Sequence, residues 1–571
     1  MLAQILVVII VAIAITALAE RRNIQPALLV AMVGLVVSFI PAVPRLELEP
    51  HIILGLVLPP MLFSAARDFS FMSFARRFGS IFNLGVLMVV ATTGVVALVA
   101  AGVVPELTLA GALVLAAVIA PPDAVTAITI GRKAGLPTAL MTVLKGESLI
   151  NDAAALTLVA AAVAAVAGTP AFIDNLPLYF LYSSVVGIIL GMLIGNFAQL
   201  ARRKLANPSL ATAVSVLVPF AAYLIAEELH ASGVLAVVAA GFALGHHSIE
   251  SGYEERMQER QFWRTIDTLL ETFVFAYIGL QLRFVVTDAL EAGIDLWSLF
   301  GAAVAIFLAT VAIRFAWVFG TSVLAHWRFK RLPDRPTQLR QYADRLAAMD
   351  VKRPGWRAKQ EARGRRFPAE PPPYQHPLSW KENVVLSWTG MRGVVTLAAA
   401  AGIPVLTATG EDFPGREVIL ALAFLVTIAT LLIQGLTLPW LIRTLDLTDP
   451  NDARYEAEQQ ALARNLAQAA MAEAIDTYRQ SHPEPAAQKM VEFMQQRNAR
   501  TTEAGAEPAF DRVGALELGQ ELLEARRQRL ISARDAQELD DTVVRETLEQ
   551  MDLEQAFMDM NSKRMAEPKA S

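Results

Sequence analysis

Thirteen apolar stretches, each close to the length that crosses a lipid bilayer, constrain this 571-residue chain more than any other feature. A crossing helix needs roughly 20 apolar residues, with about 17 to 25 tolerated, because the hydrocarbon core is about 30 Å thick. Composition agrees, since 54% of the residues are hydrophobic and only 18% are charged. The pattern predicts an all-α polytopic membrane protein, with runs at about 2–19, 25–43, 50–66, 80–103, 107–130, 138–167, 177–200, 209–229, 231–247, 265–282, 296–325, 382–405 and 415–443.

Charged residues are sparse up to about residue 445 and dense afterwards. We therefore expect a transmembrane domain over 1–445, with a long loop at 326–380, and a soluble helical tail over 446–571. The tail has two open interpretations, a solvated appendage or a segment that regulates the membrane domain through pH or dimer contact. The chain has no cysteine, which excludes disulfides and thiolate metal sites, and its net charge of −5 gives no reason to expect a nucleic-acid partner.

The first run ends in Ala17-Leu18-Ala19, which superficially matches a signal-peptide cleavage site. Signal peptides carry their positive charge before the apolar run, whereas Arg21 and Arg22 follow it. We therefore interpret the run as a retained span.

The short loops between runs predict the orientation of the chain, because cytoplasmic loops are enriched in Lys and Arg. Alternate loops fall into two sets. The first carries Arg21-Arg22, Arg67 with Arg76-Arg77, Arg132-Lys133, Arg202-Arg203-Lys204, and Arg256 with Arg260 and Arg264, whereas the second carries only Arg45, Arg283 and Arg416. This bias predicts an outside N-terminus, a cytoplasmic tail and an odd number of spans.

Three runs contain polar residues that an apolar span should exclude. An ionised side chain at mid-bilayer costs at least ~2.5 kcal/mol, so such residues usually face a cavity or a partner. In the fifth run, Pro121 and Pro122 remove backbone donors just before Asp123. We expect an interrupted helix that lines a cavity there. The alternative is a proline kink with Asp123 reaching for the membrane surface.

The sixth run carries Glu147, Ser148, Asn151 and Asp152. At 100° per residue these four lie within an arc of about 140°, so one helix face presents two carboxylates, a hydroxyl and an amide. Such a face cannot point at lipid. The alternative is a helix that begins later and leaves all four residues in cytoplasmic water.

The twelfth run holds a single arginine, Arg392, between Gly390 and Gly393. Flanking glycines favour an interrupted helix, and a buried arginine needs a carboxylate partner, for which we predict Glu147. The alternative is an arginine that reaches the cytoplasmic surface. The fifth and twelfth runs cross the membrane in opposite directions, which is typical of inverted-repeat transporters with a site near the midplane.

The remaining polar residues of the runs receive a structural interpretation. Most lie near the end of a run, where a long side chain can reach the membrane surface. This group consists of Lys145, Glu227, Glu228, His230, Asp267, Glu271 and Arg314.

Four segments strongly resemble bacterial sodium/proton antiporters of the first cation:proton antiporter family, the relatives of the eukaryotic sodium/proton exchangers. They are Gly146-Glu147-Ser148-Leu149-Ile150-Asn151-Asp152-Ala153, Pro121-Pro122-Asp123-Ala124-Val125, Ala226-Glu227 with Ser232-Gly233-Val234-Leu235-Ala236-Val237, and Trp388-Thr389-Gly390-Met391-Arg392-Gly393. The resemblance covers the whole membrane domain.

This resemblance implies roles for individual residues. Asp152 would bind a cation or a proton in turn, and Asn151, Ser148 and Asp123 would surround the ion. Oxygens of Asp152, Ser148 and Asp123 would coordinate the transported Na⁺, while Glu147 would pair with Arg392. The family further implies a homodimer in the cell membrane, an ion-binding core that moves like an elevator, and a part in pH homeostasis.

The sequence departs from the family pattern in places. Many relatives have Thr-Asp-Pro where this chain has Pro122-Asp123-Ala124, and some have a glutamate where this chain has Ser64. The ion cage is therefore expected to hold one carboxylate fewer. Electrogenic relatives have aspartate at the position of Asn151 and a lysine in the span of Arg392, so the resemblance implies electroneutral exchange here.

From these residues and the resemblance we expect a secondary antiporter of Na⁺, or of Li⁺ or K⁺, against H⁺, with competition at Asp152. A carboxylate in an apolar cavity can hold either a proton or a cation near neutral pH. We expect no enzymatic activity and no cofactor, since gradients supply the energy and no phosphate-binding loop is present. The alternatives are a sodium-coupled symporter of an organic solute and an ion channel.

Overall fold

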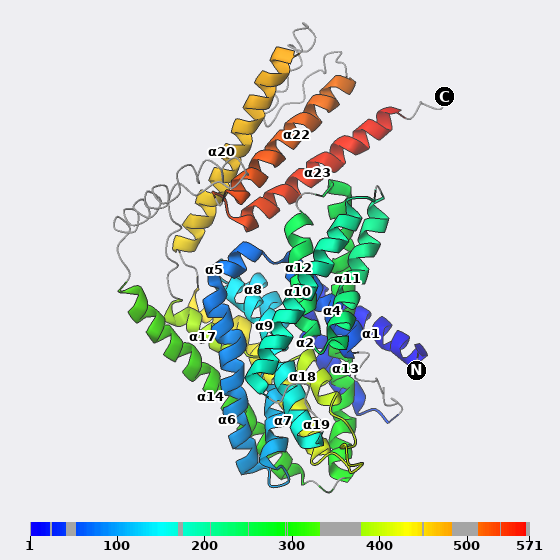
Figure 1. Ribbon diagram of the computed structural model, residues 1–571, viewed down its shortest axis with the longest axis vertical. Helices are drawn as coiled ribbons and strands as arrows, with labels where there is room; N and C mark the ends of the chain where they lie inside the picture. Colours follow the sequence, from blue (N-terminus) through cyan, green and yellow to red (C-terminus); the bar gives the residue numbers. More distant parts are fainter. Residues whose placement is uncertain are drawn as a thin grey trace. The chain divides into compact units, whose positions relative to one another are not determined.

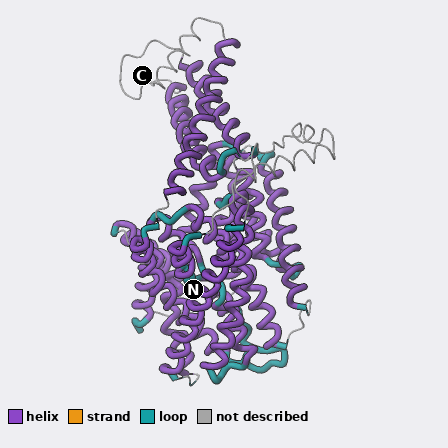
Figure 2. Tube along the Cα trace, turned by 90° about the vertical axis from the view of Figure 1, so that its left-hand side faces the viewer, coloured by secondary structure: helices purple, strands orange, loops and turns teal. Residues whose placement is uncertain are grey.

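The computed structural model describes residues 2–22, 25–41, 53–168, 175–205, 207–248, 251–291, 293, 295–331, 378–447, 450–481, 512–536 and 538–566. Every regular element in these ranges is a helix, apart from one isolated bridge between Leu406 and Asp412 (Figure 2). The chain divides into two compact units. The first comprises Met1–Ser248, Gln258–Lys330 and His376–Asp449, and the second Ile249–Met257, Arg331–Gln375 and Pro450–Ser571.

The first unit contains the apolar helices (Figure 1). They are α1 (Leu2–Arg21), α2 (Pro26–Ser38), η1 (Ile53–Val57), α4 (Leu58–Asp68), α5 (Phe71–Phe82), η2 (Asn83–Leu87), α6 (Met88–Val103), α7 (Leu109–Ile119), α8 (Ala124–Ala134), α9 (Thr138–Ala167), α10 (Leu176–Arg202), α11 (Pro208–Glu228), α12 (Gly233–His247), α13 (Tyr253–Glu291), α14 (Leu296–Phe329), α17 (Trp380–Trp388), α18 (Val394–Ala401) and α19 (Arg416–Leu445). Helix α13 begins in the second unit.

Eight helical segments in the described ranges are long and apolar enough to cross a membrane, and three further apolar helices are shorter. This confirms the predicted all-α polytopic fold, whereas the count of thirteen spans stays a prediction. The fifth and twelfth runs are each two short helices, α7 with α8 and α17 with α18, separated by irregular backbone. The predicted interruptions are therefore present.

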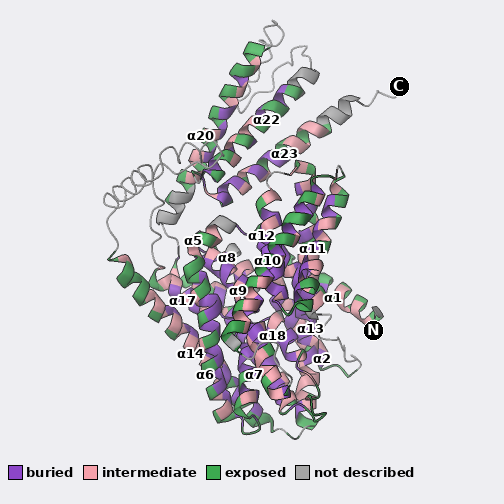
Figure 3. Ribbon diagram, in the orientation of Figure 1, coloured by how far each residue is buried: buried purple, intermediate pink, exposed green. Residues whose placement is uncertain are grey.

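The helices of the first unit form two groups. In one group, α4, α10, α11 and α12 pack around a core that includes Phe63, Ala222 and Trp263. In the other, α6, α7, α9, α14 and α19 pack closely, with Leu115 and Leu422 fully buried. Buried residues line the faces on which these helices meet, and exposed ones face outward (Figure 3). Many outward side chains are large and apolar, as lipid contact requires.

A buried polar network joins the first group of helices to α13. Glu259 on α13 accepts a hydrogen bond from Arg202 of α10 at 2.7 Å and from the Ser215 hydroxyl of α11 at 2.5 Å. The guanidinium of Arg67 on α4 lies 3.3 Å from the same carboxylate. The assignment of Arg67 and Arg202 to charged cytoplasmic loops did not predict this network. Both residues lie at helix ends, but their side chains are buried.

The second unit contains three tail helices that pack together, α20 (Pro450–Ser481), α22 (Arg512–Asp535) and α23 (Asp541–Ala566). Their shared core includes Leu523, Leu530 and Met551. The start of α13 belongs to this unit, where Arg256 forms a buried ion pair with Asp552 of α23. The helical character predicted for the tail is thus present.

Candidate ion-binding site

The break between α7 and α8 follows from its two prolines. Pro121 and Pro122 have no backbone N–H, so α7 cannot continue its hydrogen bonding beyond Ile119 and Ala120. The N–H of Asp123 would normally bond to the carbonyl of Ile119, but it donates instead to the carbonyl of Met391, at 2.6 Å. The carbonyl of Ile119 is therefore left for another donor.

That donor comes from the second interrupted helix. The Nε–H of Arg392, in the link between α17 and α18, donates to the carbonyl of Ile119 at 2.9 Å. The two breaks thus exchange hydrogen bonds, one from Asp123 to Met391 and one from Arg392 to Ile119. A cation at the last carbonyls of α7 is also favourable because a helix carries partial negative charge at its C-terminus. Arg392 therefore stabilises the crossing of the two broken helices, the place where the link between α7 and α8 meets the link between α17 and α18.

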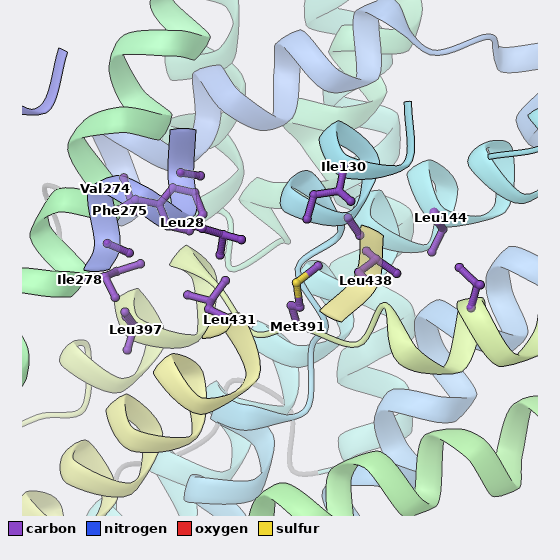
Figure 4. Close-up of a cluster of buried hydrophobic side chains, with 14 of the residues drawn as sticks. Leu28, Ile130, Leu144, Val274, Phe275, Ile278, Met391, Leu397, Leu431 and Leu438 are labelled. Carbon is purple, nitrogen blue, oxygen red and sulfur yellow. The ribbon is translucent and has the colours of Figure 1, made fainter. Parts of the chain in front are cut away.

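Helix α19 and the hydrophobic core support this crossing. The backbone N–H of Arg392 donates to the hydroxyl of Thr430 on α19, at 3.0 Å. Met391 lies buried among apolar side chains that include Ile130 of α8 and Leu438 of α19 (Figure 4). The link between α17 and α18 is thereby anchored on both sides.

Gly393 allows the closest approach within the crossing. A Cβ atom built on this residue would collide with the carboxylate of Asp123. The absence of a side chain at position 393 therefore lets Asp123 pack directly against the start of α18. This is a physical reason for the glycine that follows Arg392 in the sequence.

Helix α9 brings the predicted polar face to the crossing. The side-chain amide of Asn151 donates to the carbonyl of Pro122 at 2.5 Å, and its Oδ1 is buried with no hydrogen-bond partner. Asp152 is 6% exposed and lies close enough to Asp123 for the two carboxylates to interact electrostatically. In the described part of the chain, Asp152 has neither a hydrogen-bond donor nor an ion-pair partner.

Of the predicted ligands, Asn151, Asp123 and Asp152 lie at the crossing. Ser148 is half-buried and lies one helical turn before Asp152 on α9. The described residues contain no group of three His, Cys, Asp or Glu side chains suited to hold a metal. The available donors are the carboxylates of Asp152 and Asp123, the hydroxyl of Ser148 and the amide oxygen of Asn151. Hard oxygen donors of this kind suit a monovalent cation such as Na⁺.

The predicted pairing of Glu147 with Arg392 is wrong. Glu147 is 1% exposed, and its two carboxylate oxygens accept hydrogen bonds from Arg314 of α14, at 2.6 Å and 3.0 Å. Arg314 also donates to the carbonyl of Leu386 on α17, at 3.0 Å. Arg314 therefore links α14 to α9 and α17, while the side chain of Arg392 donates to backbone carbonyls at the crossing.

The interpretation of Arg314 as a surface-reaching arginine is wrong for the same reason, since this residue is 2% exposed. Its path to Glu147 runs beside Gly390, where an added Cβ would lie 2.7 Å from the Cδ of Arg314. In the sequence, Gly390 was the residue that indicated space for a neighbouring arginine side chain. The sequence pattern does not specify whether that side chain belongs to Arg314 or to Arg392.

Two carboxylates on α13 also lie elsewhere than expected. The apolar run at 265–282 predicts Asp267 and Glu271 at a helix start, but α13 begins at Tyr253, well before them. Asp267 accepts a hydrogen bond from the hydroxyl of Ser64 on α4, at 2.5 Å. Ser64, the position where a carboxylate was expected to be missing, is thus in contact with a carboxylate from another helix.

The chain is similar in sequence to known Na⁺/H⁺ exchangers. An uncharacterised Na⁺/H⁺ exchanger of Mycobacterium tuberculosis is 29% identical over 556 residues, which is 95% of this chain and 93% of that protein. The Na⁺/H⁺ antiporter ApNhaP of Aphanothece halophytica is 27% identical over 82% of this chain and 80% of its own length.

The fold is similar to that of the sodium proton antiporter MjNhaP1 from Methanocaldococcus jannaschii. The TM-score is 0.55 at 16% identity, over 78% of this chain and 99% of that one. The family model for the transmembrane region of sodium/hydrogen exchangers matches residues 6–444. The chain therefore belongs to the sodium/hydrogen exchanger family.

Proposed function

We propose that this protein exchanges Na⁺ for H⁺ across the membrane and that Asp152 carries the two ions in turn. The observation that supports this proposal most strongly is the environment of Asp152. Its carboxylate is buried beside Asp123 at the crossing of two broken helices and has no counter-ion among the described residues. An ionised group in that position is costly, and a bound cation or proton removes the cost.

Competition at one carboxylate is sufficient for exchange. When Asp152 is ionised, its oxygens can bind Na⁺ together with Ser148, Asp123 and the unpartnered Oδ1 of Asn151. When Asp152 is protonated, Na⁺ loses its main ligand and leaves. If only the neutralised site crosses between the two sides of the membrane, each cycle must trade a cation for a proton.

The charges at the crossing support electroneutral exchange. The Glu147–Arg314 ion pair is internally neutral. Asp123, Asp152 and Arg392 together leave one net negative charge. One Na⁺ or one H⁺ neutralises it, so the loaded crossing carries the same net charge in both directions.

We further propose the setting in which this exchange takes place. The protein would lie in the cell membrane as a homodimer, with its N-terminus outside and its tail in the cytoplasm. The group of helices around the crossing would move against the group that contains α4, α10, α11 and α12. The separate packing of these two groups is the feature that favours such a movement.

The test uses purified protein in proteoliposomes that contain a pH-sensitive dye, with no organic solute present. Addition of NaCl should drive protons across the membrane in the direction opposite to Na⁺, whereas choline chloride should cause no proton movement. Because H⁺ competes with Na⁺, the apparent KM for Na⁺ should rise as the pH falls, by up to about tenfold per pH unit once Asp152 is mostly protonated. Proton movement that requires an added organic solute would instead support a symporter.

A further inference from the structure

Helix α13 carries two carboxylates that the exchange mechanism has not used. Asp267 and Glu271 are four residues apart, so they lie on the same face of the helix, one turn from each other. Both fall in the apolar part of α13 and not at its charged start. Uncompensated carboxylates at such positions usually mark an ion path.

The contacts of Asp267 leave half of its carboxylate unused. Its Oδ2 accepts the hydrogen bond from Ser64 at 2.5 Å, whereas its Oδ1 is buried and has no partner. Arg67, the cation that lies nearest along α4, directs its guanidinium to Asp68 at 2.8 Å and to Glu259 at 3.3 Å. Among the described residues, no Lys, Arg or His forms an ion pair with Asp267.

The second carboxylate connects Asp267 to the crossing. Glu271 lies close enough to both Asp267 and Asp123 to interact electrostatically with each of them. Asp123 interacts in the same way with Asp152. Pairwise electrostatic interactions therefore connect the four carboxylates, from Asp267 on α13 to Asp152 on α9.

We propose that Asp267, held by Ser64, is a second ion-carrying carboxylate, a station that Na⁺ or H⁺ occupies on its way to or from Asp152. This proposal rests on the proposed function. Ser64 fixes Oδ2 and leaves Oδ1 available as a ligand. The charged groups that interact with Asp267 are Arg67 and Asp68 of α4 and Glu271 of α13.

The experiment compares Asp267→Asn, Asp267→Glu and Ser64→Ala with the wild-type protein in proteoliposomes. Glu291→Gln, at the exposed end of the same helix, is the matched control. Loss of a station should weaken Na⁺ capture more than turnover. We expect Asp267→Asn to raise the apparent KM for Na⁺ about tenfold with a much smaller change in maximal rate, which is the pattern of lost ion binding.

The other variants separate binding from structure. Asp267→Glu should recover most of the wild-type KM, because it restores the charge. Ser64→Ala should raise KM by a smaller factor and add little to Asp267→Asn, since the hydroxyl acts through Asp267. A wild-type KM in Asp267→Asn would overturn the proposal. A fall in rate and in thermal stability at unchanged KM would also overturn it, because that result indicates a structural role.

Failure of this inference is distinguishable from failure of the proposed function. A wild-type protein without Na⁺-dependent proton flux refutes both. A wild-type protein that exchanges normally, beside an Asp267→Asn variant with the same KM and the same dependence of rate on pH, refutes only the station.

Discussion

Removal of Arg314 should destabilise the protein more than removal of Arg392. Arg314 holds both oxygens of Glu147, which is 1% exposed, so Arg314→Ala leaves a buried carboxylate without any counter-ion. Arg392 makes no ion pair in the described structure, and its side chain donates to the carbonyls of Ile119 and Gly390. The two substitutions therefore remove interactions of different kinds.

The structure supports an estimate for each change. Breaking a buried ion pair by removing one partner typically costs about 3–5 kcal/mol. Arg392→Ala loses two hydrogen bonds to neutral carbonyls, which contribute about 1.5–3 kcal/mol each, whereas Arg314→Ala loses one such bond, to the carbonyl of Leu386, in addition to the ion pair. We therefore expect Arg314→Ala to lower the melting temperature by the larger amount.

The assay is thermal unfolding of detergent-solubilised variants, followed by intrinsic fluorescence. In a double-mutant cycle with Glu147→Gln and Arg314→Met, the changes in stability should be strongly non-additive, because each single substitution leaves the other charge buried without its partner. The matched cycle with Glu147→Gln and Arg392→Met should show a smaller coupling, because these two groups interact electrostatically but share no hydrogen bond in the described structure. Additivity in the first cycle, or a lower melting temperature for Arg392→Ala, would refute the assignment of the ion pair to Arg314.

Three further predictions concern the crossing, the tail and the stoichiometry. Gly393→Ala should reduce exchange at least about tenfold, because its Cβ collides with the Asp123 carboxylate; Gly94→Ala, where a Cβ meets nothing within 4 Å, should retain activity. The chain has no native cysteine, and the side chains of Tyr253 and Asp559 are hydrogen-bonded, so a short thiol cross-linker should join the two cysteines of the Tyr253→Cys/Asp559→Cys variant. Absence of cross-linking would argue against this contact. With the membrane potential clamped, the Na⁺ gradient at which internal pH stops changing should not depend on voltage, whereas one net charge per cycle would shift that balance by about 2.3 kcal/mol per 100 mV.

The broken helices could be predicted from the sequence because their causes are local. Pro121 and Pro122 remove donors wherever they stand in a helix, and the glycines around Arg392 weaken the second helix. The polar face of α9 could be predicted from helical periodicity alone. Its expected bounds, 138–167, agree with the structure, since the run begins after Pro137 and ends before Gly168.

The partners across helices could not be predicted in the same way. Arg314 and Arg392 both lie in apolar runs, and only the packing of α14 against α17 decides which one reaches Glu147. The contact of Ser64 with Asp267 joins residues 203 positions apart. Such contacts depend on tertiary packing, which a single sequence without a second family member to compare does not specify.

Na⁺-dependent proton flux through Asp152→Asn in proteoliposomes tests whether Asp152 carries the exchanged ions. The substitution keeps the size of the side chain but removes the charge and the titratable proton. We expect this variant to fold and insert but to show no Na⁺-dependent proton flux. Its melting temperature should be at or above that of the wild type, because a buried charge without a counter-ion is removed. Exchange at the wild-type rate by this variant would contradict this role of Asp152.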